Sequence, residues 1–501
     1  MGLPYKSGNS NFCILSLRIM QIQTLDLIVF LIFTLGTVLF GSSFIRKNKD
    51  AKDYTSGGGN MPGIVVGMSI FATYVSSISF LALPGNAFSG NWNSYVFSLS
   101  IPVASILAAK FFVPFYRKIK SISAYSFLEE RFGYWARAYA ASCYLLTQVS
   151  RIGSVLFLMA LPMHSMLGWS VSSIIIITSL CVIVYSVFGG IKAVIWTDAI
   201  QGTILVLGAL TCVIVLFFSF PEGIGQFFEV GSEFDKFSLG SFGPELSHST
   251  FWVMLVYGIF INLQNYGIDQ NYVQRYKSAK NDKSARFSAL FGGLLYVPVS
   301  LLFFIIGTAL FVYYQAHPGL LPADITGDKV FPYFIVHELP VGVTGLLIAA
   351  IFAAGMSTIS TSINSGATVI LTDFFQRGKK EVDEKRNMKI LYSTSFILGL
   401  LGMGVGLAMM SVKSALDAWW SLAGIFSGGM LGLFLLGYVS KKVKNVYALI
   451  GTVCGVSLIS WMTFSGQTIF HSYLTIVFGT ITIFCVGLLL SMLVPKLLKK
   501  K

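Results

Sequence analysis

Long apolar stretches alternate along this chain with short polar connections. A helix needs about 20 apolar residues to cross the hydrocarbon core of a bilayer, so each stretch predicts a membrane-spanning helix. The pattern therefore predicts an all-α polytopic membrane protein with about 13 transmembrane helices. The predicted spans are residues 25–45, 61–84, 94–115, 138–163, 169–188, 193–220, 249–268, 287–313, 337–369, 389–410, 415–438, 445–463 and 469–494.

Two of these spans carry polar and helix-breaking residues at bilayer depth. In 61–84 the run FATYVSSISFLALPGNAF places three serines past the middle, and in 249–268 the run GIFINLQNYGIDQNY places three amides and a glycine in the second half. Such residues are tolerated where backbone lines a cavity or is buried in protein. Because four spans separate the two, they predict a five-plus-five inverted repeat with a solute site at the broken helices. Two unrelated polar patches at helix interfaces are the alternative.

This reading divides the chain into six parts. They are an extracellular N-terminal extension (1–24), an extra first helix with a cytoplasmic loop (25–60), the first repeat (61–220), an extracellular loop (221–248), the second repeat (249–438) and two C-terminal helices with a basic cytoplasmic tail (439–501). Met20, just ahead of the first span, is an alternative start to Met1.

Charge fixes the predicted orientation. The chain carries a net charge of +14, with 35 Lys and Arg against 21 Asp and Glu, and only 11% of its residues are charged. The basic residues sit in alternate short loops rather than in one patch, which argues against a nucleic-acid partner. Under the positive-inside rule they place the N-terminus outside and the C-terminus in the cytoplasm. The inner set is Arg46, Lys47, Lys49, Lys52, Arg117, Lys118, Lys120, Arg131, Arg137, Lys192, Arg275, Lys277, Lys280, Lys283, Arg286, Arg377, Lys379, Lys380, Lys385, Arg386, Lys389, Lys441, Lys442, Lys444, Lys496, Lys499, Lys500 and Lys501.

Arg151 stands apart from this set, near the middle of an apolar span with no other Lys, Arg, Asp or Glu from Ala138 to Gly189. An arginine at the bilayer centre costs about 2.5–3.5 kcal/mol on insertion scales, so it normally faces a cavity or a polar partner. One interpretation is a structural arginine bonded to backbone carbonyls. The other is a counter-ion for an anionic solute.

A stripe of hydroxyl groups on the ninth span suggests a cation site. Ser357, Ser360, Thr361 and Asn364 share one helix face by their i, i+3, i+4, i+7 spacing. Asp198 is the acidic residue deepest inside a span, and an isolated carboxylate there needs a cation. A sodium ion would satisfy it. The alternatives are hydroxyl groups that only pack helices together and a salt bridge from the carboxylate to a loop lysine such as Lys192.

The sequence predicts no enzyme. It contains no HExxH motif, Walker loop or pair of catalytic carboxylates, and GGGN at 57–60 is too weak a motif to predict a phosphate site. The six cysteines are scattered, and we expect no disulfide from them. An ion gradient is therefore the expected energy source.

Four segments carry a resemblance to a known family: SGGGNMPGIVVGMSIFATYVSSISFLALPGNAF, GGIKAVIWTDAIQG, DQNYVQRY and IFAAGMSTISTSINS. Through them residues 20–494 resemble the sodium/solute symporter family, and within it the bacterial sialic acid symporters. The resemblance implies the five-plus-five inverted-repeat fold of the leucine-transporter type. It also implies an arginine beside the carboxylate of sialic acid, a role that falls on Arg151.

The resemblance assigns three groups of site residues. Solute binding falls on Ser76, Ser77, Ser79, Ser94, Ser98, Arg151 and Tyr266. A first sodium site, site A, falls on Ala72, Val75, Ala354, Ser357 and Thr358. A second, site B, falls on Asp198, Ser357, Ser360 and Thr361. Ser98 stands where a relative has a glutamine, Ser94 where it has an aromatic residue and Tyr266 where it has a phenylalanine.

We therefore expect a sodium symporter that imports N-acetylneuraminate by alternating access, with two sodium ions per solute, and that acts as a monomer. A sodium symporter for a monocarboxylate, proline or a neutral sugar is the second candidate. A membrane sensor built on a transporter fold is the third.

Overall fold

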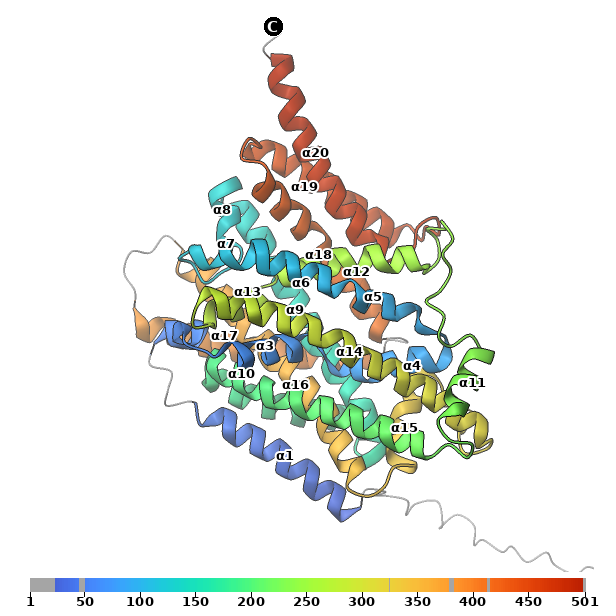
Figure 1. The fold of residues 1–501 in the computed structure, drawn as a ribbon. Coiled ribbons are helices and arrows are strands. Elements are labelled where there is room, and N and C mark those ends of the chain that lie inside the picture. The colour runs from blue at the N-terminus through green and yellow to red at the C-terminus, as the bar shows by residue number, and fades with distance from the viewer. Residues whose placement is uncertain (1–22, 45–49, 324, 378–382, 412–414, 499–501) are drawn as a thin grey trace, which may run out of the picture.

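The computed structural model describes residues 23–44, 50–323, 325–377, 383–411 and 415–498 (Figure 1). Helices make up almost all of this part, which contains no β-strand and one isolated bridge between Met61 and Ala279. The all-α class predicted from the sequence is therefore confirmed. The helices are α1 (Thr24–Ser42), α2 (Ala51–Ser56), η2 (Gly57–Gly59), α3 (Gly63–Tyr74), α4 (Ser77–Ser89), η3 (Trp92–Ser94), α5 (Tyr95–Leu99), α6 (Ile101–Leu107), η4 (Ala108–Phe112), α7 (Val113–Lys118), α8 (Ser126–Phe132), α9 (Tyr134–Leu167), α10 (Val171–Phe218), α11 (Gly225–Glu233), α12 (Phe251–Ile268), α13 (Gln270–Ser278), α14 (Asp282–Ala316), η5 (Gly327–Lys329), α15 (Val330–His337), α16 (Val343–Val369), η6 (Ile370–Phe375), α17 (Glu384–Ala408), η7 (Met409–Ser411), α18 (Ala415–Val439), α19 (Asn445–Phe464) and α20 (Leu474–Leu498).

Ten helices of the described residues are long and apolar enough to cross a membrane, and one bent pair makes an eleventh. Of two shorter apolar helices, Val171–Val187 lies within the predicted span 169–188, and Gly428–Val439 overlaps 415–438 and ends one residue beyond it. Of the predicted N-terminal extension (1–24), only residues 23 and 24 belong to the described residues. The predicted loop cations in 45–49 and 378–382 and the last three lysines of the tail also lie outside the described residues.

The predicted span 61–84 is broken within its bounds, whereas 249–268 forms one continuous helix, α12, and the break follows it directly. α3 and α4 are separated at Val75, whose φ of −76° and ψ of 117° are extended, and the pair bends by 52°. α12 and α13 are separated at Asp269, with φ −74° and ψ 129°. The side chain of Asp269 caps α13 by accepting a hydrogen bond of 2.7 Å from the backbone N–H of Asn271. Each break leaves backbone groups without helical partners beside polar side chains.

α10 is longer than the sequence predicted, because it joins the predicted spans 169–188 and 193–220. It is a continuous helix of 48 residues except at Gly190, where φ is 61° and ψ is −172°. Only glycine adopts this conformation readily. The predicted span 337–369, by contrast, is longer than the helix observed there. α15 ends at His337, and α16 begins only at Val343.

The broken helices lie in the interior of the bundle. α3 packs between α10 and α14, and α16 packs against α9, α10 and α1. Figure 1 shows α1 along one flank of the bundle and α19 with α20 on the opposite flank. In the α16 span 89% of the residues are buried, the largest share among the ten candidate spans of the described residues. Polar groups on α16 are therefore removed from lipid and available to an internal site.

Candidate functional site

A polar cavity of about 170 Å³ lies between the broken helices and α9. Its walls come from α4, α5, α9, α12, α13 and α14, so segments distant in the sequence meet around it. The lining residues are Tyr74, Ser76, Ser79, Ala82, Leu83, Asn86, Ser94, Phe97, Ser98, Thr147, Gln148, Arg151, Met254, Tyr257, Ile261, Gln264, Asn265, Asp269, Tyr272 and Tyr296. We call this space the polar cavity.

Arg151 is half-buried on α9 and lines the polar cavity. One of its terminal nitrogens, Nη2, donates a hydrogen bond of 2.9 Å to the backbone oxygen of Thr73, one residue before the end of α3. The guanidinium therefore has a backbone partner, as the structural interpretation required. It also presents donors to a cavity, as the counter-ion interpretation required, since a guanidinium carries five N–H groups.

Four of the five predicted serines line the polar cavity, namely Ser76, Ser79, Ser94 and Ser98. Ser98 is fully buried, and its hydroxyl lies 2.6 Å from that of Ser300 on α14. Ser77 is different, because it is fully buried and does not line the cavity. Its hydroxyl has no hydrogen-bond partner among the described residues.

Tyr266, the remaining predicted solute residue, does not line the polar cavity either. Its side chain is fully buried behind the wall, 5.9 Å from the ring of Tyr74 and 4.9 Å from that of Tyr272. These two tyrosines do line the cavity. The structure thus places Tyr266 as a support for the wall rather than as part of its surface.

Several lining residues were not predicted from the sequence. Thr147 and Gln148 lie four and three residues before Arg151, so helical spacing alone puts them on its face. Asn265 and Asp269 share a face of the broken α12–α13 segment in the same way. Asp269 brings a carboxylate to the cavity that holds Arg151. The lining formed by described residues therefore contains one cation and one anion.

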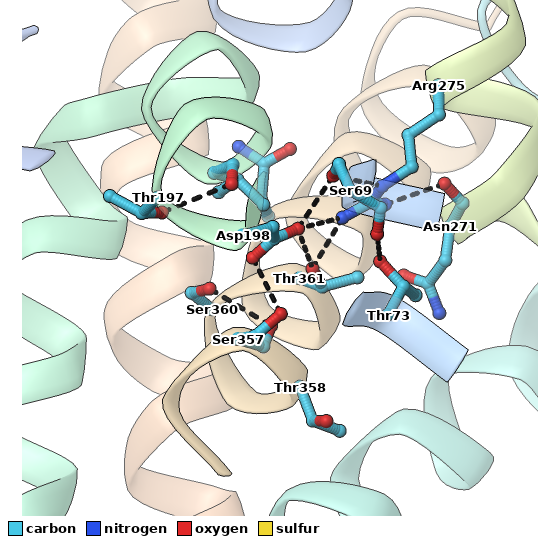
Figure 2. Close-up of polar contacts among 12 residues, drawn as sticks. Ser69, Thr73, Thr197, Asp198, Asn271, Arg275, Ser357, Thr358, Ser360 and Thr361 are labelled. Carbon is cyan, nitrogen blue, oxygen red and sulfur yellow. Dashed lines mark hydrogen bonds and ion pairs between the residues drawn. The ribbon is translucent and has the colours of Figure 1, made fainter. Parts of the chain in front are cut away.

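A second polar cluster surrounds the carboxylate of Asp198 on α10 (Figure 2). One carboxylate oxygen, Oδ1, accepts a hydrogen bond of 2.7 Å from Ser357. The other, Oδ2, accepts one of 2.8 Å from Ser69 and lies 3.4 Å from the hydroxyl of Thr361. Figure 2 shows side chains from α3, α10, α13 and α16 converging on this group, which we call the Asp198 cluster.

The cation partner of Asp198 is Arg275, and this pairing was missed in the sequence. Arg275 was counted with the loop cations, but it lies on α13 and is fully buried. Its Nη2 atom is 2.6 Å from the carboxylate and 2.7 Å from the hydroxyl of Thr361. Lys192, the alternative partner, pairs with Asp53 at 3.2 Å instead.

The predicted sodium ligands divide between the cluster and its surroundings. Ser360 donates a hydrogen bond of 3.1 Å to the backbone oxygen of Ser357, and Thr358 donates one of 3.0 Å to that of Ala354. In Figure 2 Thr358 lies apart from Asp198, with no contact drawn between them. Val75 is the extended residue at the break after α3, and Ala72 lies in the last turn of that helix.

Hydrogen bonds connect the Asp198 cluster to the polar cavity. Ser69 contacts Asp198, and its backbone oxygen accepts a hydrogen bond of 2.7 Å from Thr73, whose own backbone oxygen binds Arg151. One turn of α3 thus links the two charged centres.

A second connection runs through α13. Nη1 of Arg275 donates a hydrogen bond of 2.8 Å to the backbone oxygen of Asn271. The side chain of Asn271 donates one of 3.3 Å to Gln148, a lining residue of the polar cavity. Hydrogen bonds therefore connect Asp198 to the wall of the polar cavity through α3 and, separately, through α13.

Comparison with known proteins supports the predicted resemblance. Residues 54–455 match the Sodium:solute symporter family. The sodium/sialic acid symporter NanT of Aliivibrio fischeri is 33% identical over 93% of this chain and 92% of its own. SiaT of Proteus mirabilis, also a sodium/sialic acid symporter, is 34% identical over 89% and 92%. Sodium-coupled monocarboxylate transporter 1 of Xenopus laevis is 27% identical over 88% and 72%.

Solved structures give the same picture. The substrate-bound outward-open state of a Na+-coupled sialic acid symporter superposes with a TM-score of 0.89 at 31% identity, covering 94% of this chain and 98% of the other. Mhp1, a nucleobase-cation-symport-1 family transporter, superposes with a TM-score of 0.57 at 14% identity, which is a likeness of fold alone.

Proposed function

Because the chain belongs to the sodium:solute symporter family, we propose that it imports a sialic acid, N-acetylneuraminate, together with sodium ions. The relatives named sodium/sialic acid symporters support the solute, since each is at least 33% identical over about nine-tenths of both chains. The protein is thus a transporter of the multi-pass membrane class, not an enzyme.

The observation that carries the proposal is Arg151 in a polar cavity beside a helix break. A guanidinium there supplies charge-assisted hydrogen bonds to a carboxylate. Ser76 and Ser79 add hydroxyl groups on the same cavity wall. Asp269 then gives a reason to prefer a sialic acid over a simple monocarboxylate. Its carboxylate needs hydrogen-bond donors, and the several hydroxyl groups and the amide of a sialic acid provide more of them than a small monocarboxylate such as lactate.

We further propose two sodium ions per solute. Site A would use the backbone oxygens of Ala72, Val75 and Ala354 with the hydroxyls of Ser357 and Thr358. Oxygen ligands suit a hard cation, and the break at Val75 supports backbone oxygens free to bind one.

Site B would use Asp198 with the hydroxyls of Ser357, Ser360 and Thr361. The hydrogen bonds among these groups support a set of oxygens already gathered in one place. Arg275 holds one carboxylate oxygen at 2.6 Å, so an arriving sodium ion would have to share that oxygen or loosen the pair. A related solved symporter is described as revealing a novel Na+ site, which favours a second ion.

The finer architecture follows the same proposal. Residues 61–220 and 249–438 would form inverted repeats, with the broken pairs α3–α4 and α12–α13 in corresponding positions. The basic loops would face the cytoplasm and the N-terminus the outside. Sodium would bind first and brace α3 against α16. Relative rocking of the repeats would then expose the solute inward.

Uptake of labelled N-acetylneuraminate into proteoliposomes tests this function. We expect uptake only with an inward sodium gradient, and competition by other sialic acids but not by lactate, proline or glucose. Sodium-dependent uptake abolished equally by lactate would support the monocarboxylate alternative instead. Uptake that ignores sodium would refute symport.

A further inference from the structure

A second, larger cavity of about 630 Å³ lies on the face that carries the basic loops. It is separate from the polar cavity, with which it shares no lining residue. Six cationic side chains line it, against one carboxylate, that of Glu384. The cations are Lys52, Arg117, Lys120, Arg137, Lys277 and Arg377. We call this space the basic cavity.

The three arginines of the basic cavity are already neutralised. Arg117 pairs with Asp282 at 2.5 Å. Arg137 pairs with Asp373 at 2.5 Å and with Glu129 at 2.8 Å. Arg377 pairs with the other oxygen of Glu129 at 2.7 Å. These pairs build the wall and leave little charge for a ligand.

The three lysines are not neutralised in this way. Lys52 and Lys120 are exposed and have no carboxylate within ion-pair distance among the described residues. Lys277 donates a hydrogen bond of 2.6 Å to the backbone oxygen of Ile119, which carries no charge. Glu384 accepts a hydrogen bond of 2.9 Å from the backbone N–H of Ala51 and keeps its charge, which offsets one of the three lysines. The cavity therefore keeps an excess of positive charge.

Lys277 lies part-buried on the same lining. Burial, and then the neighbouring guanidinium of Arg117, lowers the pKa of Lys277 to about 8. The hydroxyl of Ser121 on the same lining adds a neutral donor for oxygen atoms, whereas those of Thr55 and Ser56 donate to the backbone oxygens of Ala51 and Lys52.

The lysines also come from separate elements. Lys52 lies on α2, Lys120 follows α7, and Lys277 ends α13, the inner half of a broken helix. Gln274 already ties α13 to α2 through a hydrogen bond of 2.6 Å to the backbone oxygen of Thr55. An anion among the lysines would add a second tie between the same segments.

We propose that the basic cavity binds a phosphate-class oxyanion among Lys52, Lys120 and Lys277. Phosphate suits the excess charge because it carries up to two negative charges at neutral pH and accepts several hydrogen bonds at once. The group could belong to a free cytoplasmic phosphate or to the headgroup of an anionic phospholipid. This site is separate from the proposed sialic acid and sodium sites.

Titration calorimetry with inorganic phosphate on the purified full-length protein, at constant ionic strength, tests the site. The variant Lys52→Gln/Lys120→Gln should bind phosphate at least about tenfold more weakly than wild type, because two charge-assisted contacts are lost. The matched control is Lys441→Gln/Lys442→Gln, which removes the same charge from two exposed positions of the loop between α18 and α19. It should bind like wild type.

Nanodiscs separate the two sources of phosphate. Equal binding of inorganic phosphate in phosphatidylcholine and phosphatidylglycerol discs would assign the site to free phosphate. Binding in phosphatidylcholine discs alone would assign it to the lipid headgroup. No phosphate binding in either disc, or equal affinities in the two double variants, would overturn the proposal. The readout needs neither sialic acid nor sodium, so this inference and the transport function can fail separately.

Discussion

At the scale of single residues, the protein holds two internal arginines in different ways. Arg275 is fully buried and donates hydrogen bonds to Asp198, Ser69 and other internal groups. Arg151 donates a hydrogen bond to the backbone oxygen of Thr73 and lines the polar cavity. The first arrangement suits a fixed internal ion pair. The second keeps donors for a solute.

Asp198→Asn should affect both the stability of the fold, through the ion pair with Arg275, and the cooperativity of sodium binding. Breaking a buried pair by removing one partner costs about 3–5 kcal/mol, since Arg275 would keep an uncompensated charge. We expect a lower free energy of unfolding, and a Hill coefficient for sodium in uptake assays that falls from near two towards one. Thermal unfolding and sodium titration measure the two effects.

The double variant Asp198→Asn/Arg275→Gln separates the effect on stability from the effect on sodium cooperativity. It should recover much of the stability, because no buried charge is left unpaired, while sodium cooperativity stays low. A Hill coefficient near two in either variant would rule out Asp198 as a sodium ligand.

The sequence predicted Arg151 and Asp198 because each is a charge inside an apolar run. It could not predict their partners. Arg275 sits in the run DQNYVQRYKSAK, whose composition is that of a basic loop, and only the turn of α13 into the bundle buries it. That Tyr266 lies behind the cavity wall was not predictable for a related reason, because the face of a broken helix depends on the angle at its break.

At the scale of elements, polar composition located the first helix break inside its span and placed the second a few residues too early. Serines in one span and amides in the other contradict a continuous lipid-facing helix, and breaks occur at Val75 and Asp269. Helix ends were harder to predict. The turn ELPVG before α16 contains Leu339 and Val341, and these apolar residues extended the predicted span ahead of the start that backbone geometry sets at Val343.

The break in α10 at Gly190 can be tested directly by substitution. Its φ of 61° and ψ of −172° lie in a region that costs other residues about 1–3 kcal/mol. Gly190→Ala should therefore lower the melting temperature of the purified protein. Gly36→Ala in α1 is the control, since a Cβ there meets no atom within 4 Å and alanine favours a helix. Equal melting temperatures for the two variants would contradict the assigned break.

At the scale of the whole molecule, the proposed stoichiometry predicts electrogenic transport. Two sodium ions with one sialic acid anion move one net positive charge inward. A membrane potential of 100 mV, negative inside, is worth about 2.3 kcal/mol per charge, equivalent to about fiftyfold in the accumulation ratio. A potassium diffusion potential imposed with valinomycin should raise sialic acid accumulation. Accumulation unaffected by the potential would indicate one sodium ion per solute.

The central claim is a sodium-dependent cavity in which Arg151 binds the carboxylate of the solute. Calorimetric binding of N-acetylneuraminate to purified wild type and Arg151→Ala, in sodium and in choline buffer, tests it most directly. Lys110→Gln, which changes an exposed cation within another span, is the control. We predict saturable binding by wild type and the control in sodium alone, and none by Arg151→Ala, although sodium still raises its melting temperature. Binding by Arg151→Ala with wild-type affinity would contradict the account.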